Sequence, residues 1–334
     1  MADFALVTCS RHHVEKTCKQ AFVKRLFTRI SKAIDANKLT PDMKTVEIGE
    51  NTVCHIIKLP FDLNGLARLS KGRLKKISRH ILEKCMEHHI ENCLLPKQVC
   101  SFPHFEACVE NPYSGKCLYK SLLIAILEEI CSKRGTKLYD TDIAILGGQN
   151  TKTLSSVARL LSTRVKFITV ITDGEYSVQD EFEKICEETG LSSRITNNFE
   201  NGIRDAGIII NLGNAEKLNI SSRFESRAIV INYGDKSIEK ILDKNILING
   251  IETALPENLL SKVGKSIYEF FSPLEISEIF ICHDLNIENE VASGIIEDRT
   301  MEMLSEKFIK DGYRINCFIG RHGKLRLEEL KGFA

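Results

Sequence analysis

A strand, a helix and a second strand follow one another without a break between Asp142 and Asp173. The first strand, Ile143–Leu146, is an unbroken apolar run, as is typical of a strand buried on both faces of a sheet. A second apolar run, Val165–Ile171, predicts the next strand. Between the two runs, apolar side chains recur at helical spacing: Leu154, Val157, Leu160 and Leu161. This alternation predicts a βαβ unit, in which a helix connects two parallel strands.

The same alternation continues to about residue 250. A helix over Val178–Thr189 ends at Gly190, a common helix terminator. Four short runs predict further strands: Ser193–Thr196, Gly207–Ile210, Ala228–Ile231 and Ile246–Ile248. Crossovers between parallel strands are right-handed and cover both faces of the sheet. We therefore predict an α/β fold with a doubly wound parallel sheet over Asp142–Gly250.

The preceding residues predict a separate, smaller α/β domain. Thr45–Ile48 and Val53–Leu59 flank turn residues at 49–51, which predicts a β-hairpin. Asn92–Leu95 predicts a short strand. Helical patterns cover three segments: Val14–Ile34, a basic segment that begins after Ser70, and the apolar segment Cys117–Cys131.

Polar linkers divide the chain into three expected domains. We place an N-terminal α/β domain at 1–136, which ends with the linker Lys133–Thr136, and the parallel-sheet domain at 137–255. Residues 256–334 show two helical patterns, Leu259–Phe271 and Ser293–Asp311, and a final hairpin. The sequence leaves open whether this last part packs back on the N-terminal domain.

Composition excludes several classes of protein. The 334 residues are 43% hydrophobic and 27% charged, as in an ordinary globular chain, and the net charge of +1 argues against a nucleic-acid partner or an acidic membrane surface. No stretch has the length of a membrane span, and the N-terminus lacks signal-peptide features, so we expect a cytoplasmic location. The 12 cysteines are scattered, several of them in apolar runs, and we expect them to be reduced.

Small and polar residues follow the predicted strands at their carboxyl ends, where open parallel sheets bind ligands. These ends hold Gly147 and Gly148, Asp173, the segment Asn211–Asn214, and the segment Asn232–Asp235. The helix after the first strand begins near Thr151, Lys152 and Thr153, and its N-terminal N–H groups favour an anion. Turns also require glycine, asparagine and aspartate, so the sequence leaves a ligand site and plain turns both open.

The segment Asp142–Gly250 resembles the NAD(P)-binding domain of Rossmann-type dehydrogenases, especially shikimate dehydrogenase and glutamyl-tRNA reductase, where a separate α/β catalytic domain precedes it. The resemblance implies NAD or NADP as cofactor. It implies phosphate contacts near Gly147 and Gly148 and a ribose contact at Asp173, whose carboxylate favours NAD. It places the nicotinamide close to three residues: Asn211, Gly213 and Asn214.

The glycine signature departs from that family. Where G-x-G-x-x-G places its second and third glycines, this chain has Gln149–Lys152. The pair Lys152-Thr153 also resembles the end of a phosphate loop, but Thr151 and Leu146 replace the glycines that such a loop requires. These departures put close approach of the backbone to a pyrophosphate in doubt.

Two sets of cysteine and histidine have spacings that suit a metal: Cys85, His89 and Cys93, and Cys100, His104 and Cys108. The short paired spacing of structural zinc sites is missing, and we predict no bound metal.

The basic run 70–80 has two apolar residues at helical spacing and no interleaved aromatic residues, which favours an amphipathic helix over a nucleic-acid surface. In the first domain, three residues at predicted strand ends are candidates for substrate contact or catalysis: Lys58, Asp62 and Lys97.

Two hypotheses remain from the sequence. The first is a nucleotide-binding protein of oxidoreductase ancestry that acts as an NAD(P)-dependent dehydrogenase or reductase of a small polar metabolite. The second is a non-catalytic Rossmann-like protein that has lost dinucleotide binding and serves in regulation or assembly. The missing glycines favour the second, and the polar strand ends favour the first. Either allows a homo-oligomer.

Overall fold

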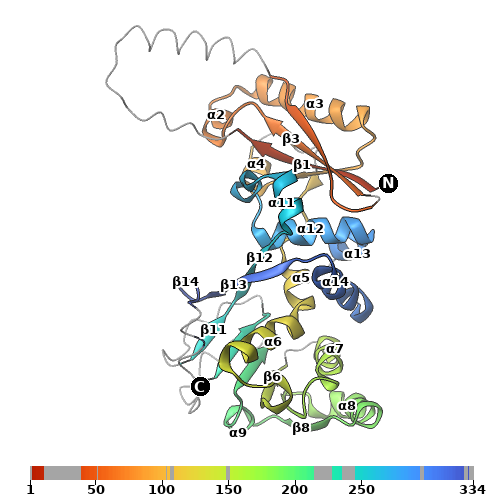
Figure 1. The fold of residues 1–334 in the computed structure, drawn as a ribbon, viewed down its shortest axis with the longest axis vertical. Coiled ribbons are helices and arrows are strands. Elements are labelled where there is room, and N and C mark those ends of the chain that lie inside the picture. The colour runs from red at the N-terminus through yellow and green to blue at the C-terminus, as the bar shows by residue number, and fades with distance from the viewer. Residues whose placement is uncertain are drawn as a thin grey trace, which may run out of the picture. The chain divides into compact units, whose positions relative to one another are not determined.

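A computed structural model describes residues 2–10, 39–50, 52–102, 104–105, 109–147, 151–213, 228–234, 245–293, 297–326 and 330 (Figure 1). The helix expected over Val14–Ile34 lies outside these residues, as do Gly148 and Asn214.

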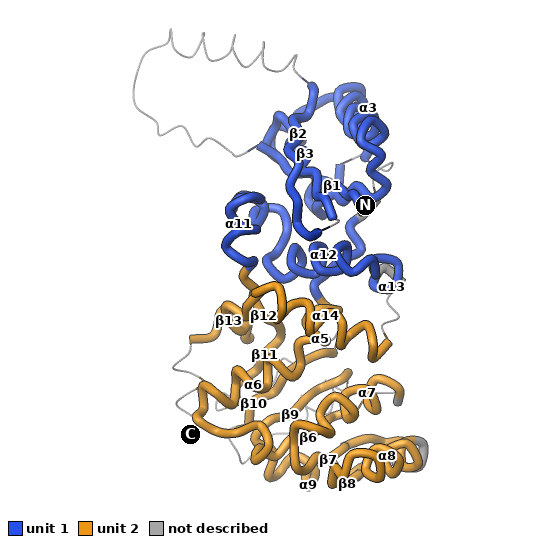
Figure 2. The backbone as a smooth tube through the Cα atoms, turned by 45° about the vertical axis from the view of Figure 1, so that its right-hand side comes forward, with its two compact units in different colours: residues 1–115, 255–295 blue, residues 116–254, 296–334 orange. Residues whose placement is uncertain are grey.

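The chain forms two compact units, each built from two separate stretches (Figure 2). Unit 1 comprises Met1–Gly115 and Leu255–Ile295, and unit 2 comprises Lys116–Ala254 and Ile296–Ala334. These limits differ from the boundary that the linker at 133–136 suggested. The apolar segment before that linker belongs to unit 2, where it forms α5 (Lys116–Ser121) and α6 (Leu123–Arg134).

Unit 2 contains a parallel six-stranded sheet in the order β11-β10-β9-β6-β7-β8. The strands are β6 (Ile143–Leu146), β7 (Phe167–Ile171), β8 (Ser192–Thr196), β9 (Ile208–Asn211), β10 (Ile229–Asn232) and β11 (Ile246–Ile248). The predicted α/β fold with a parallel sheet is therefore confirmed, and so is the parallel pairing of the first two strands.

The centre of this sheet is covered on both faces. β6 lies between β9 and β7, with Ile143 in register with Ile208 and Ile168. Successive side chains of a strand point to opposite faces, and every residue of β6, β9 and β10 is buried. This burial explains why these strands read as continuous apolar runs in the sequence.

The crossover helices α7 (Thr151–Ser162) and α8 (Glu175–Thr189) pack against each other (Figure 1). Both connect strands that are added in the same direction, so right-handed crossovers place them on the same face of the sheet. Gly190 ends α8 with a φ of 74°, in the left-handed region that favours glycine, as the sequence predicted for a helix terminator. The short helix α9 (Phe199–Ile203) precedes β9.

Other elements complete unit 2. The single helix expected over Cys117–Cys131 is interrupted at Leu122, which separates α5 from α6. The helix α14 (Asp298–Lys310) packs against α5. An antiparallel sheet of three strands contains β12 (Gly250–Ala254), β13 (Arg314–Gly320) and β14 (Gly323–Lys324), so the predicted final hairpin is confirmed.

Unit 1 has its own five-stranded sheet in the order β2-β3-β1-β4-β5, in which only β2 is antiparallel to its neighbour among the described strands. The strands are β1 (Ala2–Cys9), β2 (Asp42–Glu47), β3 (Thr52–Leu59), β4 (Asn92–Leu95) and β5 (Val109–Glu110). The antiparallel β2–β3 pair is the predicted hairpin. The basic segment forms α3 (Lys71–Glu87), which buries Ile77 and Ile81 in the core of this unit, and the short helices α2 (Leu63–Ala67) and α4 (Lys97–Cys100) follow β3 and β4.

The second stretch of unit 1 contains a helix that the sequence patterns did not reveal. The helix α12 (Pro273–Leu285) has no solvent-exposed polar face, and Ile276 through His283 are all buried. The segment before it, expected to be one helix, is divided at Gly264 into α11 (Glu257–Val263) and the 3-10 helix η2 (Lys265–Glu269), because Gly264 has a φ of 87°. A short helix, α13 (Glu288–Ser293), follows α12.

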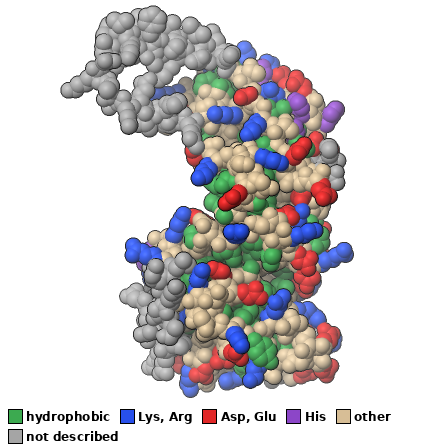
Figure 3. Space-filling model, viewed as in Figure 1, with side chains coloured by type: hydrophobic (Ala, Val, Ile, Leu, Met, Phe, Trp, Pro, Cys, Tyr) green, Lys and Arg blue, Asp and Glu red, His purple; other side chains and the backbone are tan. Residues whose placement is uncertain are grey.

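Charged side chains of both signs are interspersed over the visible surface of each unit, in keeping with a net charge of +1 (Figure 3). Within the described part of the chain, no helix combines the length and the apolar character needed to cross a membrane.

Candidate functional site

The carboxyl edge of the unit 2 sheet has the topology of a ligand site. With β6 counted as the first strand, the order read from β8 is third, second, first, fourth, fifth and sixth. This is the order of doubly wound dinucleotide-binding sheets, in which crossovers change direction between the first and fourth strands. Unit 2 is therefore Rossmann-like, and its switch point lies between the ends of β6 and β9.

Gly147 follows β6 at this switch point. It is buried, and its N–H donates to the Ile171 carbonyl at 2.9 Å. A Cβ atom at this position would lie 3.1 Å from Leu154 Cδ2. Gly147 thus allows α7 to approach the sheet closely, which is one of the roles that glycine has in dinucleotide-binding turns.

The first turn of α7 carries the residues expected to meet a phosphate. Thr151 begins the helix, Lys152 is exposed and Thr153 is half-buried. No acidic residue lies in this first turn, so the ammonium group of Lys152 and the helix dipole act in the same sense. The start of α7 therefore favours an anion. The glycine expected beside it, Gly148, lies outside the described residues.

Asp173 follows the second strand of the sheet and has an exposed side chain. The preceding Thr172 is held by two contacts: its N–H donates to the Thr196 carbonyl at 3.1 Å, and its hydroxyl accepts from the Gly174 N–H at 3.2 Å. These bonds fix the backbone on both sides of Asp173. The carboxylate therefore stands at the strand end where dinucleotide-binding sheets place the acceptor for ribose hydroxyls.

Three asparagines form a hydrogen-bonded row across the ends of β9, β10 and β11. Asn211 donates through Nδ2 to Asn232 Oδ1 at 2.7 Å, and Asn232 donates through Nδ2 to Asn249 Oδ1 at 3.3 Å. Asn211 is fully buried, Asn232 is buried, and Asn249 is exposed. We call these three residues the asparagine row. Their amides hydrogen-bond to one another, so the row forms a continuous polar surface at the carboxyl ends of β9, β10 and β11.

The same asparagines hold the turns that follow their strands. The Oδ1 atoms of Asn211 and Asn232 accept from the N–H groups of Gly213 and Gly234 at 3.3 and 3.2 Å. A Cβ atom on Gly234 would lie 3.0 Å from Gly213 Cα, so these two turns are in direct backbone contact. The resemblance to Rossmann-type dehydrogenases implied a nicotinamide near Asn211 and Gly213. The structure shows the Asn211 side chain occupied with the turn and with Asn232.

Two tyrosines lie beside the row. The rings of Tyr119, on α5, and Tyr233, which follows β10, have centroids 4.5 Å apart. Burial raises the pKa of both phenols. The Tyr119 hydroxyl donates to the Ile248 carbonyl at 3.4 Å. The Tyr233 hydroxyl is buried and has no hydrogen-bond partner among the described residues.

The candidate residues of unit 1 lie at the carboxyl ends of β3 and β4. Lys58 is exposed near the end of β3, and Lys97 is exposed at the start of α4. Asp62 accepts from the Gly65 N–H at 2.6 Å and so caps α2. Burial and, to a smaller extent, the Asp62 carboxylate raise the pKa of Cys9 to about 12. Asp62 thus has a structural role that the sequence did not indicate.

A buried polar cluster on α12 was also missed. Asn111 donates through Nδ2 to Glu275 Oε1, and burial raises the pKa of the Glu275 carboxyl although Ser272 and Lys97 oppose the shift. Glu278 accepts from the Gly115 N–H at 2.7 Å. These contacts tie the segment after β5 to α12.

His283, one turn further along α12, stacks on Phe4 with ring centroids 3.9 Å apart. Its Nε2 atom lies 3.4 Å from the Tyr113 hydroxyl. The ring is buried, and this burial lowers its pKa to about 4, so His283 is neutral at physiological pH.

Metal-binding residues do not gather in the described structure: no group of three or more His, Cys, Asp or Glu side chains there could hold a metal ion. Cys85 and Cys93, from the two expected sets, are buried, and Cys93 hydrogen-bonds to Cys85 and lowers its pKa. Cys108 lies outside the described residues.

No protein-family model matches this sequence, and no curated protein does. Among solved structures, the chain is similar to L-tryptophan dehydrogenase from Nostoc punctiforme, with 10% identity, a TM-score of 0.30 and coverage of 92% of this chain and 79% of that one. It is also similar to ornithine carbamoyltransferase from Campylobacter jejuni, with 11% identity, a TM-score of 0.30 and coverage of 92% of this chain and 86% of that one. A third similar structure is shikimate 5-dehydrogenase from Listeria monocytogenes, with 10% identity, a TM-score of 0.25 and coverage of 69% of this chain and 78% of that one. The assignment of unit 2 as Rossmann-like depends on its strand order and not on these similarities.

Proposed function

We propose that unit 2 binds a nucleotide, with NAD as the preferred ligand, along the carboxyl edge of its parallel sheet. The observation that carries this proposal is the strand order, which puts the end of β6, the start of α7 and Asp173 where such sheets hold a dinucleotide. The phosphates would lie over Gly147 and the first turn of α7, near Lys152 and Thr153. The adenosine ribose would lie at Asp173.

The preference for NAD follows from charge. An exposed carboxylate at the end of the second strand accepts hydrogen bonds from both ribose hydroxyls, whereas it repels the 2′-phosphate of NADP. If the bound nucleotide supports a reaction, we propose hydride transfer to or from a small polar metabolite, and Lys58, Asp62 and Lys97 remain the residues proposed for substrate contact or catalysis.

One observation favours a second candidate function, a Rossmann-like protein without redox activity. The Asn211 amide and the contact between Gly213 and Gly234 occupy the end of β9 with internal interactions. A nicotinamide there would have to bind over the asparagine row and not within it. A protein that binds only the adenine half of a nucleotide would be compatible with this arrangement.

A thermal-shift screen followed by calorimetric titration tests the proposal. The full chain is screened against NAD, NADP, ATP and adenosylmethionine, since a ligand that binds the folded state alone raises the melting temperature. Asp173→Ala should weaken NAD binding about ten-fold or more, because it removes a charged acceptor worth roughly 1.5–3 kcal/mol.

Asp180→Ala is the matched control, because it removes another exposed carboxylate, on α8, away from the strand end. It should bind NAD as the parent does. If no nucleotide binds the parent at millimolar concentration, or if the two variants bind equally well, the site assignment is wrong.

A further inference from the structure

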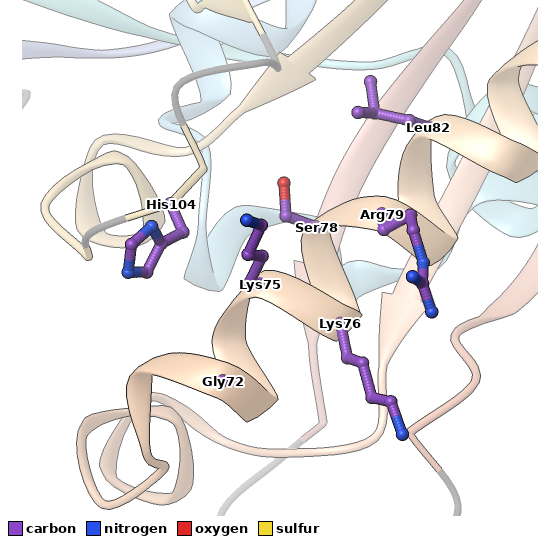
Figure 4. A pocket seen from close by; sticks show the side chains of 7 residues that line it. All are labelled: Gly72, Lys75, Lys76, Ser78, Arg79, Leu82 and His104. Atoms are coloured by element: carbon purple, nitrogen blue, oxygen red, sulfur yellow. The ribbon is translucent and has the colours of Figure 1, made fainter.

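A second cationic site lies in unit 1, on α3. A hollow of about 530 Å³ opens there, and its described lining consists of Gly72, Lys75, Lys76, Ser78, Arg79, Leu82 and His104 (Figure 4). Three of these side chains carry a fixed positive charge, and no carboxylate is among them. The volume is within the range of small-molecule pockets, roughly 300–1,000 Å³.

Three polar groups converge in the hollow. In Figure 4 the Lys75 amino group extends toward the segment that carries His104, and the Ser78 hydroxyl lies beside Lys75. Lys75 is exposed, whereas Ser78 is only 4% exposed. The structure gives the Ser78 hydroxyl no hydrogen bond to another described residue. The hydroxyl lines the hollow, so it is available to form a hydrogen bond with a bound ligand.

The backbone adds to the positive field. Ser70, the N-cap residue of α3, makes no side-chain capping bond, and no acidic residue lies in the first turn of this 17-residue helix. Gly72, in that turn, lines the hollow, and a Cβ atom there would meet nothing within 4 Å. The free N–H groups of a helix start and its dipole attract anions. The first turn of α3 and Lys75 therefore act together.

His104 faces α3 from a different segment in an unusual backbone conformation. Its φ is 76°, in the left-handed region, which costs an L-residue other than glycine about 1–2 kcal/mol. Such outliers concentrate at binding sites. Lys76 and Arg79 extend along the other side of the helix in Figure 4, and Arg79 is paired with Glu83 at 3.4 Å. They raise the local potential without pointing at His104.

We propose that this hollow binds a small molecule through a phosphoryl group, held by Lys75, Ser78 and His104. A tetrahedral dianion can accept hydrogen bonds from an ammonium, a hydroxyl and an imidazole N–H at the same time. The described part of the lining contains no Phe, Tyr or Trp on which a base could stack, so a single-stranded nucleic acid is a poorer fit. The site belongs to unit 1, and its proposal does not rest on the function proposed for unit 2.

Calorimetric titration of the full chain with inorganic pyrophosphate and with fructose 1,6-bisphosphate tests this site. Lys75→Gln should weaken binding about ten-fold or more, and Ser78→Ala about three-fold or more. The matched control is Lys84→Gln, which removes the same charge from the same helix. It lies nine residues further on, a distance of about 13 Å at 1.5 Å per residue, which exceeds the screening length of about 10 Å at 0.1 M salt.

Several results would overturn the proposal. The proposal is wrong if neither probe binds at millimolar concentration, or if Lys75→Gln binds the probes as tightly as the parent does. It is also wrong if Lys75→Gln and Lys84→Gln lose the same amount of affinity, because equal losses would indicate a nonspecific charge effect. Binding of a single-stranded RNA 12-mer in place of both probes would identify a nucleic-acid surface instead. Lys152→Gln should leave pyrophosphate binding unchanged; if it weakens binding, the probe binds at the start of α7 in unit 2.

Discussion

Removal of the middle member of the asparagine row tests whether this row stabilises the carboxyl edge of unit 2. Asn232→Ala deletes the oxygen that accepts from the Asn211 amide at 2.7 Å and from the Gly234 N–H at 3.2 Å. It also deletes the amide group that donates to Asn249 at 3.3 Å. Asn211 is fully buried, so its amide is shielded from bulk water.

The magnitude follows from these contacts. Loss of a hydrogen bond at a buried amide costs about 1–3 kcal/mol, and loss of the bond to the half-buried Gly234 N–H adds less. We expect Asn232→Ala to lower the free energy of unfolding by about 2–4 kcal/mol. For a unit of this size that corresponds to about 5–15 °C in melting temperature. Asn249→Ala removes one bond from an exposed side chain and should cost less than about 1 kcal/mol.

The assay must report on unit 2 alone, because a protein with two units need not unfold in one step. Hydrogen exchange of peptides that contain β10 gives the local free energy of opening for each variant. The double variant Asn211→Ala/Asn232→Ala should cost less than the sum of the two single changes, since removing both partners leaves fewer orphaned groups. If Asn232→Ala and Asn249→Ala differ by less than about 0.5 kcal/mol, the row does not stabilise the edge.

Two further predictions concern buried titratable groups. Burial lowers the pKa of His283 to about 4 from an ordinary value of 6.5, so the unfolded chain takes up a proton that the folded chain does not. His283 therefore reduces stability as the pH falls from about 6.5 to about 4, by up to roughly 3 kcal/mol, and has no such effect above about pH 7. Urea unfolding of parent and His283→Phe across this range should give a shallower pH slope for the variant; equal slopes would contradict the prediction. Tyr233→Phe deletes a buried hydroxyl that has no partner among the described residues and should raise the melting temperature, whereas Tyr119→Phe, which loses a bond to the Ile248 carbonyl, should not. A drop in melting temperature for Tyr233→Phe would show that the hydroxyl is satisfied after all.

The sequence predicted the central strands of the unit 2 sheet well because they are buried along their whole length. Ile143–Leu146 and the end of β10 are covered on both faces, and that requirement appears directly as an unbroken apolar run. Burial on all sides also explains why the sequence pattern did not predict α12. A helix buried on all sides has no polar face, so it shows no helical period. Its start was nevertheless marked: Ser272 and Glu275 form a capping box around Pro273.

The candidate sites were harder to predict than the strands. Asn211 and Asn232 could be placed at strand ends, but their hydrogen bond depends on the register of β9 against β10, which no local pattern contains. No sequence pattern marked Asn249 as part of a candidate site. His104 lies opposite α3 although 29 positions separate it from Lys75, and only the fold brings them together. The basic run was interpreted as a solvated helix face, which describes the charges but not the hollow beside them.

The division of unit 1 into two stretches has a consequence for the order in which the protein can fold during synthesis. Glu278 and Glu275 of α12 hold Gly115 and Asn111, so the first stretch cannot complete its contacts before the second has been made. Ribosomes add about 5–20 residues per second, so the 180 residues between the ends of the two stretches, 115 and 295, take roughly 10–40 s. During that interval the surface that α12 later covers is exposed on the nascent chain, and transiently exposed apolar surface favours aggregation.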